Sequence, residues 1–415
     1  MEWKHYKMDE LIEEISMGPF GSDVKKEFYV DNGVPILNGS NLQGFKLQED
    51  SFGYLTKEKA DSLKKCNAHR GDIIVTHRGT LGQIVYVPVN SKYDRYVISQ
   101  SQFRFRCKAD LVDVQYLVYY FHTREGQYKI LANASQVGVP ALARATSTFR
   151  LIDIKLPPLA TQRRIASILS SLDRKIELNN KINADLEEMA QAIFKNWFVD
   201  FEPFKNGKFV DSELGMIPEG WKVGRADDYY QINIGKTPPR KEHKWFSTNP
   251  ADKIWVSIAN MGNSGIFISD SSEYLTQEAV DSHNIIMVPR NTILLSFKLT
   301  VGRVAIADKE LTTNEAIARF ILSDDKYMEY LYLYLKKFDY NSLGSTSSIA
   351  TAVNSKTIKG MQMLQPSDKV IDAFHIQVNP IFEKIRSLTK ENSRLSLLRD
   401  TLLPRLMSGE LEVPE

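Results

Sequence analysis

The stretch IASILSSLDRKIELNNKINADLEEMAQAIFKNW, residues 165–197, decides the fold. Its apolar side chains recur in alternating steps of four and three residues, and Asn179 and Asn183 fill the two gaps in this stripe. The stretch FHIQVNPIFEKIRSLTKENSRLSLLRDTLLPRL, residues 374–406, repeats the stripe 209 positions later. Two long helices with the same stripe can bury each other along it, as in a coiled coil. We therefore expect two long helices that pair.

A helix of about 38 residues would be about 57 Å long at 1.5 Å per residue, which is long for a core helix. An amphipathic helix lying on its own domain is the alternative. Pro380 lacks an N–H and is expected to kink or interrupt the second helix. The interval of 209 also relates Ala141 to Ala350. The expected helix-pairing stripe consists of Ile165, Leu169, Leu172, Ile176, Leu186, Ile193, Phe374, Val378, Ile381, Ile385, Leu388, Leu395 and Leu402.

A second repeat precedes each of these stretches. The segment YLTKEKADS, residues 54–62, returns as YLTQEAVDS at residues 274–282, 220 positions later. The same interval aligns GDIIVTHRGTLGQIVYV, residues 71–87, with NTILLSFKLTVGRVAIA, residues 291–307. Both segments are typical of a strand, a glycine-containing loop and another strand. The chain is therefore expected to be a tandem duplication of a globular half followed by a helix.

The repeat predicts an α+β fold in which two mainly-β globular halves are joined by two long helices. If the helices run antiparallel, the halves lie at opposite ends and are related by a pseudo-twofold axis. The proline and glycine residues between the halves exclude a continuous helix there. The expected segments are a first globular half at 1–156, a first helical region at 157–200, a linker at 201–220, a second globular half at 221–365 and a second helical region at 366–415.

Composition limits the class of protein. The chain has 415 residues, of which 43% are hydrophobic and 25% charged, as in folded soluble proteins. The formal net charge of +2 is too small to hold nucleic acid by overall charge alone, so local patches would be needed. Two cysteines exclude a disulfide framework and a cysteine-rich zinc site. No uncharged apolar stretch approaches the roughly 18 residues of a membrane span, and we expect a cytoplasmic protein.

The sequence offers little for catalysis. Phosphate-binding, dinucleotide-binding, zinc-protease and C-x-x-C motifs are all missing from it. The tetrad Asn379-Pro380-Ile381-Phe382 resembles the Asn-Pro-Pro-Phe motif of adenine methyltransferases. Its third residue is isoleucine, it lies on the helical stripe, and no glycine-rich loop for S-adenosylmethionine precedes it. We therefore expect neither an active site nor a metal site in this chain.

Basic loops with glycine favour contact with nucleic acid. The segment GKTPPRKEHKW, residues 235–245, has its counterpart in MGPFGSDVKK, residues 17–26. Basic side chains bind phosphates, whereas arginine and amide side chains also read base edges. A solvated basic loop without a ligand is the alternative. The candidate DNA contacts, taken from these segments and the aligned loops, are Ser22, Lys25, Lys26, Arg78, Gln100, Gln102, Arg144, Lys236, Arg240, Lys241, Lys244, Lys298, Arg303, Asn314 and Lys356.

Several runs resemble the specificity subunits of type I restriction-modification systems, and the resemblance covers essentially the whole chain. The runs LPPLATQRRI at 156–165 and FKNWFVDF at 194–201 are similar to the central helical region of that family. GPFGS at 18–22 resembles the start of a first recognition domain, and DSELG with IPEGW at 211–221 resembles the entry to a second. Thr161 departs from the family pattern, which usually has glutamate there.

The resemblance implies a function. Each globular half would be a target recognition domain that reads one half of a bipartite, asymmetric double-stranded DNA sequence, and the paired helices, an antiparallel coiled coil, would set the gap. Two methylation subunits would dock on the helices and supply S-adenosylmethionine and adenine chemistry. Restriction subunits with ATP-driven translocation would complete the complex. The chain itself would be non-catalytic and hold no cofactor. A scaffold that pairs through its helices without recognising DNA is the alternative.

Overall fold

The computed structural model describes residues 3–135, 138–343 and 353–413, so Ala350 lies outside the described residues. Unit 1 comprises residues 1–176 and 394–415, and unit 2 comprises residues 177–393. Both divisions fall inside the two long helices. Each unit therefore contains one globular half and a segment of each helix.

The two long helices each contain 40 residues: α6 spans Leu159–Phe198 and α12 spans Asp368–Met407. Their first residues and their last residues are both 209 positions apart, which is the interval of the sequence repeat. Pro158 directly precedes α6, as suits a helix start, and Gly409, with a φ of 77°, follows the end of α12.

The helices are antiparallel in both units. In unit 1 the Arg399 guanidinium of α12 donates a hydrogen bond of 2.7 Å to the Asp173 carboxylate of α6. In unit 2 Asn179 Nδ2 of α6 donates to Asn392 Oδ1 of α12 over 2.8 Å. Higher numbers in α6 therefore face lower numbers in α12, which confirms the expected antiparallel arrangement.

Asparagine side chains form a polar layer between the helices of unit 2. Asn179 is fully buried, and its amide also donates to Glu391 over 2.9 Å. Asn392 Nδ2 in turn donates to Asn180 Oδ1 over 2.8 Å. A buried polar layer in an apolar helix seam lowers stability but fixes the register, because other alignments would leave its amides unpaired.

The apolar stripe lies between the helices and the globular halves. In both units, side chains of α6 and α12 belong to the same buried core as the sheet and helices of that unit. Each helix therefore packs on its partner helix and on a globular half together. Of the predicted stripe, Ile165, Leu169, Phe374, Val378, Ile385 and Leu388 are buried, and Leu172, Ile176, Leu186, Ile193, Ile381, Leu395 and Leu402 are half-buried.

Of the two effects expected at Pro380, the interruption is wrong, because α12 continues through it, and the kink stays a prediction. Proline removes one backbone hydrogen bond, to the carbonyl of Ile376 four residues earlier. Ile376 is 74% exposed, so water can hydrate that carbonyl. On the opposite face Val378 and Phe382 are fully buried and hold both sides of the proline in the core. Tertiary packing thus outweighs the local preference.

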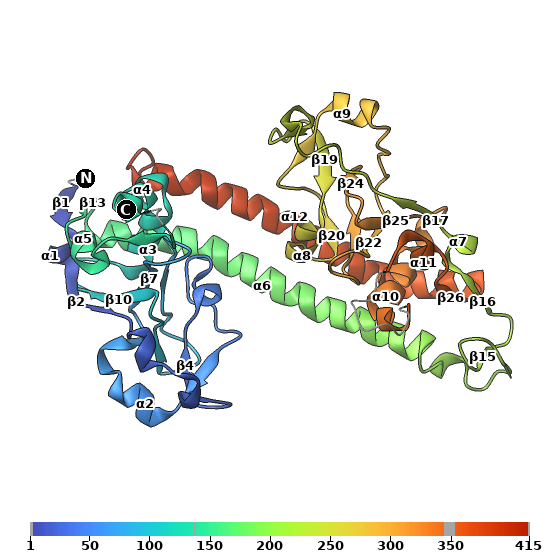
Figure 1. The fold of residues 1–415 in the computed structure, drawn as a ribbon, viewed down its shortest axis with the longest axis horizontal. Helices are drawn as coiled ribbons and strands as arrows, with labels where there is room; N and C mark the ends of the chain where they lie inside the picture. Colours follow the sequence, from blue (N-terminus) through green and yellow to red (C-terminus); the bar gives the residue numbers. More distant parts are fainter. Residues whose placement is uncertain (1–2, 136–137, 344–352, 414–415) are drawn as a thin grey trace. The chain divides into compact units, whose positions relative to one another are not determined.

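The described part of unit 1 contains an antiparallel four-stranded sheet and a mixed five-stranded sheet (Figure 1). The hairpin of β7 and β8 is antiparallel, which confirms the predicted strand, loop and strand. The four-stranded sheet has the order β2 (Ile12–Met17), β10 (Gln102–Cys107), β7 (Ile73–Thr76), β8 (Ile84–Tyr86), and the five-stranded sheet has the order β3 (Tyr29–Val30), β5 (Gly53–Leu55), β4 (Val34–Ile36), β9 (Arg95–Val97), β6 (Asn67–His69).

Further strand pairs and helices belong to the described part of unit 1. After β10 the chain forms two helices, α3 and α4, and the Thr123 side chain caps the second one. The remaining elements are β1 (Lys4–Lys7) paired with β13 (Asp153–Leu156), β11 (Ala134–Ser135) paired with β12 (Ala141–Leu142), α1 (Met8–Leu11), α2 (Lys57–Ser62), α3 (Val114–His122), α4 (Arg124–Leu131) and α5 (Ala145–Arg150).

Unit 2 repeats the plan of unit 1. The strands β17, β25, β22 and β23 follow one another as β2, β10, β7 and β8 do, and the β22–β23 hairpin is antiparallel as predicted. Its sheets have the orders β17 (Gln231–Ile234), β25 (Ile317–Ile321), β22 (Ile293–Ser296), β23 (Val304–Ala307), β20 (Phe267–Ile268) and β18 (Phe246–Ser247), β21 (Tyr274–Leu275), β19 (Lys253–Val256), β24 (Thr312–Thr313).

The predicted linker contains a short hairpin rather than a helix, in keeping with its prolines and glycines. After β25 the second half forms the helix α10. The other elements of unit 2 are β14 (Phe209–Val210), β15 (Ile217–Pro218), β16 (Lys222–Arg225) paired with β26 (Gln362–Gln365), α7 (Ala226–Tyr229), α8 (Ile258–Asn263), α9 (Gln277–Ser282), α10 (Met328–Lys337) and α11 (Ser355–Lys359).

A buried ion cluster fastens the sheet of unit 2 to α12. The Asp308 carboxylate, only 2% exposed, lies 3.3 Å from Arg386 Nε, 3.3 Å from Lys390 Nζ and 3.5 Å from Arg290 Nε. Arg386 is also buried, and it donates to Asn291 Oδ1 over 2.8 Å. One buried carboxylate thus balances several cations, so this cluster depends on Asp308.

A buried carboxyl on α10 makes the stability of unit 2 depend on pH. Glu329 is fully buried, with Oε2 2.8 Å from His375 Nδ1. Burial raises the pKa of Glu329, against the lowering effect of the His375 hydrogen bond. The folded state therefore keeps this proton to higher pH than the unfolded state does.

Replacing this carboxyl, Glu329→Gln, is expected to flatten the pH dependence. In the wild type, stability should fall as the pH rises from the unfolded pKa of Glu329 to its raised folded pKa, by up to about 1.4 kcal/mol per pH unit. The variant should show no such fall, so its stability relative to the wild type should increase from pH 4 to pH 7.5 in urea unfolding. Parallel pH profiles of the two proteins would contradict this assignment.

Candidate nucleic-acid interface

Four loops of unit 1 meet where β2 and β7 end and β10 begins, at one end of the strands of the four-stranded sheet. The loop after β2 joins the turn before β10 through a 2.8 Å bond from Gly18 N to Gln102 O. The β7–β8 loop joins the same turn, because His77 N donates to Ser101 O over 2.9 Å. It also meets the segment 140–144, since Leu142 N donates to His77 O over 2.8 Å. Backbone bonds thus hold these loops in one cluster.

Unit 2 holds its corresponding loops in the same way. Gly235 N donates to Ile317 O over 3.1 Å, and Lys236 N donates to Thr313 O over 2.9 Å. The β22–β23 loop joins them because Phe297 N donates to Ala316 O over 3.0 Å. The bonds from Gly235 N and Phe297 N match those from Gly18 N and His77 N of unit 1 by position in the repeat. The duplication therefore preserves a loop cluster in each half.

Glycine is required where the first loop crosses the turn. A Cβ on Gly18 would lie 2.0 Å from Ser99 O, and a Cβ on Gly235 would lie 2.0 Å from Asn314 O. Both neighbouring atoms belong to the backbone and have little freedom to move. The two glycines thus occupy the same tight crossing in the two clusters.

The candidate residues of unit 1 lie in the loops of this cluster or directly beside them, and all but Gln102 are exposed. Gln102 is 1% exposed, and its amide accepts from Ser99 N over 2.9 Å and donates to Asn38 O over 3.3 Å. It holds the turn together, so we leave it out of the interface. The exposed candidates of unit 1 are Ser22, Lys25, Lys26, Arg78, Gln100 and Arg144, and its lysines and arginines form no ion pair within the described part of the chain.

Arg240 of unit 2 is bound by its own loop cluster. Its guanidinium makes two hydrogen bonds, of 2.8 and 3.1 Å, to the Glu273 carboxylate. It also lies 4.3 Å from the ring centroid of Phe246 and 4.5 Å from that of Trp255. Arg240 could thus bind a phosphate only if its hydrogen bonds to Glu273 broke. These contacts indicate that Arg240 stabilises the conformation of the loop.

Other candidate side chains of unit 2 also make contacts within their own unit. Lys236 Nζ donates to the Asn284 carbonyl over 3.0 Å, and Lys244 Nζ lies 4.0 Å from the Trp245 ring centroid. Arg303 donates to Ile258 O over 2.7 Å. Asn314 accepts from Ala316 N over 3.1 Å and shapes the turn. Lys241, Lys298 and Lys356 are exposed.

An acidic group also lies in the loop cluster of unit 2. The Glu315 carboxylate accepts a hydrogen bond from the Thr237 hydroxyl. Although burial acts to raise the pKa of Glu315, this bond and the nearby Lys298 and Arg240 charges lower it overall. The carboxylate is therefore ionised at neutral pH. Unit 2 presents a mixed surface, whereas the exposed candidates of unit 1 are basic or neutral.

Sequence reasoning missed several residues of the clusters. Glu273 lies 33 positions from its partner Arg240, and no local pattern links the two. Phe20 and Leu299 are large apolar side chains that are 81% and 100% exposed in these loops. The alignment at 220 positions, which places Leu299 opposite Gly79, could have drawn attention to Leu299.

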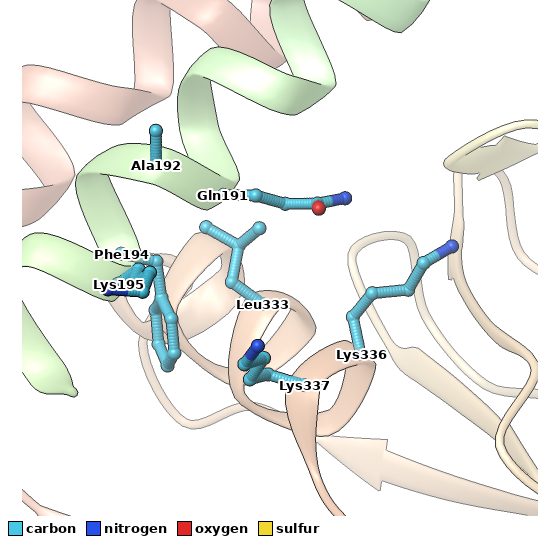
Figure 2. Close-up of a pocket in the computed structure, with 7 residues that line it drawn as sticks. All are labelled: Gln191, Ala192, Phe194, Lys195, Leu333, Lys336 and Lys337. Atoms are coloured by element: carbon cyan, nitrogen blue, oxygen red, sulfur yellow. The ribbon is translucent and has the colours of Figure 1, made fainter.

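Unit 2 also has a pocket outside its loop cluster. It has a volume of about 200 Å³ and lies between α6 and α10. Phe194 and Leu333 line its apolar side, as Figure 2 shows. Its charged groups are Lys195, Lys336 and Lys337, without a carboxylate, histidine or cysteine in the lining. Among the described residues, moreover, no cluster of histidine, cysteine or acidic side chains could hold a metal ion.

Within the parts of the chain that the structure describes, no helix is long and apolar enough to cross a membrane.

Comparisons with known proteins agree with this architecture. A family model described as the type I restriction modification DNA specificity domain matches residues 1–188 and 218–369. The chain is 26% identical to the type I restriction enzyme HindI specificity subunit of Haemophilus influenzae, over 99% of this chain and 100% of that protein. It is 29% identical to the MjaIX specificity subunit of Methanocaldococcus jannaschii, over 100% of this chain and 94% of that protein.

A solved structure shares the fold. The S subunit of a type I restriction-modification system from M. genitalium matches with a TM-score of 0.56 at 16% sequence identity. The match covers 98% of this chain and 96% of that one.

Proposed function

Because the chain belongs to the family of type I restriction modification DNA specificity domains, which recognise DNA, we propose that each unit reads one half of a bipartite, asymmetric DNA target. The observation that carries this proposal is the repeated loop cluster. Both halves hold three matching loops by matching backbone bonds, yet they present different side chains. A preserved frame with different side chains is what two readers of different sequences need.

The family match also favours DNA recognition over a scaffold without DNA function. A scaffold that paired only through α6 and α12 would have no use for a repeated cluster of polar and charged loops. In unit 1, the cations of this cluster are exposed and unpaired within the described residues, so phosphates can reach them. The small net charge of +2 fits local contact with DNA, and partner subunits would add further phosphate contacts.

We further propose that catalysis lies in partner subunits. Two methylation subunits would dock on the paired helices and supply S-adenosylmethionine and adenine methylation, and restriction subunits would supply ATP-driven cleavage. The lining of the pocket between α6 and α10 has lysines but no carboxylate, histidine or cysteine to act beside them. The fixed register of the helices would set the distance between the two half-sites, because α6 and α12 run through both units.

The proposal is tested by removing the unpaired cations of unit 1. The variant Lys25→Ala, Lys26→Ala, Arg78→Ala should weaken binding of the complex with its methylation subunits to target DNA. Each lost phosphate contact should lower the slope of log affinity against log salt by about 1. Gel-shift titrations between 50 and 200 mM salt would measure this slope, with Lys155→Ala as an exposed control in β13. An unchanged slope would refute the placement of DNA on this cluster.

A further inference from the structure

One apolar side chain in the loop cluster of unit 2 is fully exposed and has an unfavourable backbone conformation. Leu299, at the tip of the β22–β23 loop, is 100% exposed. Its φ is 61°, in the left-handed region that a branched side chain rarely adopts. Thr300 N donates to Lys298 O over 2.7 Å, so Leu299 is the centre of a γ-turn with positive φ, which is rare and strained. A glycine at this position would adopt the positive φ without strain and would expose no apolar side chain.

The corresponding position of unit 1 is Gly79, and it shows what the turn alone requires. Gly79 has a φ of 87°, so the same left-handed conformation recurs in the first half. Folding is therefore served by glycine at this point of the repeat. A leucine there places a large apolar group in solvent at a cost in strain, with no contact in the described structure that would compensate for it. Such a departure from local rules points to function.

The loop below Leu299 is firmly held. Ser296 Oγ donates to Thr300 O over 2.6 Å, and Gly302 N donates to Ser296 O over 3.0 Å. The backbone bond from Phe297 N to Ala316 O fastens the loop to the neighbouring turn. The leucine thus projects from a rigid base and is not a mobile side chain on a loose loop. A rigid base is needed if a side chain is to press against another molecule.

The surroundings of Leu299 suit DNA. Lys298, directly before it, is exposed, and its charge acts on Glu315 together with that of Arg240. The tip therefore lies within the loop cluster that we assign to DNA. Proteins that separate base pairs insert an apolar side chain such as leucine between them, while flanking cations hold the phosphates.

Resting on the proposed function, we propose that Leu299 is a wedge that inserts between two base pairs of the half-site read by unit 2. Insertion would bury the leucine and unstack one base step, so recognition would depend on how easily that step opens. Steps such as TA and CA are the most easily unstacked. Leu299 would therefore select the sequence at this step without a hydrogen bond to a base. Unit 1, with Gly79, would lack a wedge from this loop.

The experiment places 2-aminopurine at single positions of both half-sites, with the full chain bound to its methylation subunits. The adenine that becomes methylated is left out, because methyltransferases extrude their target base. We expect the wild type to raise the fluorescence about threefold or more at one step of one half-site. Leu299→Gly and Leu299→Ala should abolish that rise and weaken binding about tenfold, with no change in the other half-site. Val89→Ala, which shortens an 82% exposed valine of unit 1, is the matched control.

The outcomes separate the wedge from the proposed function. An equal fluorescence rise with Leu299→Gly, or no unstacked step with the wild type, would overturn the wedge while leaving DNA recognition intact. Absence of sequence-specific binding by the wild type would instead refute the proposed function. The Leu299→Gly variant should also have an unfolding temperature at least as high as that of the wild type, because glycine adopts the positive φ without strain. A lower unfolding temperature would show that Leu299 serves folding and would overturn the proposal.

Discussion

Replacing Gly235 by alanine is expected to abolish recognition of the half-site read by unit 2. The new Cβ would lie 2.0 Å from Asn314 O and 2.4 Å from Thr313 O, and neither backbone atom can move away without shifting the turn. The loop and the turn would separate, and several base contacts of about 1–3 kcal/mol each would be lost. We expect the affinity for a target to fall by about 100-fold or more, measured by gel shift with the complex of this chain and its methylation subunits.

Two variants make this result specific. A Cβ on Gly265 meets no atom within 4 Å, so Gly265→Ala should bind as the wild type does. Gly18→Ala forces the corresponding clash with Ser99 O in unit 1 and should impair the other half-site instead. If both variants impaired the same half-site, or if Gly235→Ala bound normally, the loop clusters would not be the reading surfaces.

The largest loss of stability is expected from Asp308→Ala. This change leaves the buried Arg386 guanidinium without its buried counter-ion, and Arg290 and Lys390 without a shared partner. Removing one partner of a buried ion pair costs about 3–5 kcal/mol. Because Arg386 retains the half-exposed Glu383 at 3.1 Å, we expect about 3 kcal/mol, measured as a lower urea midpoint.

Lys390→Ala removes a partner of the same carboxylate that is 50% exposed. It should change the stability by no more than about 1 kcal/mol, because exposed ion pairs contribute little. Equal losses for Lys390→Ala and Asp308→Ala would show that burial does not govern this cluster.

The long helices were accessible to sequence reasoning because their signal is periodic and repeated. The stripe at 165–197 and 374–406 predicted the helices, and the hydrogen bonds between Asp173 and Arg399 and between Asn179 and Asn392 confirm that they are antiparallel. Of the kink or interruption expected at Pro380, the interruption is absent, because that expectation rested on local backbone preference alone. Burial of the apolar face of α12 outweighs one missing hydrogen bond.

The candidate site was less accessible, because its side chains are arranged by contacts distant in sequence. The composition of the turn at 99–102 suggested that Gln102 reads bases, yet its amide bonds the backbone of its own turn and of Asn38. The basic segment at 235–245 gave no hint that Glu273 binds Arg240. The charge of a basic loop can be read from the sequence. The acidic residue that pairs with it is distant in sequence and is identified only from the folded structure.

As proposed above, this chain directs methylation to a DNA target in two separate parts. Adenine methylation should be mapped across the genome of a host that carries this gene with its methylation subunits, and of the same host without this gene. We expect a gene-dependent motif of two specified segments separated by a gap of fixed length and free sequence. Gly235→Ala should remove the requirement for only one segment or abolish methylation. A single uninterrupted motif, or methylation that does not depend on this gene, would contradict the account.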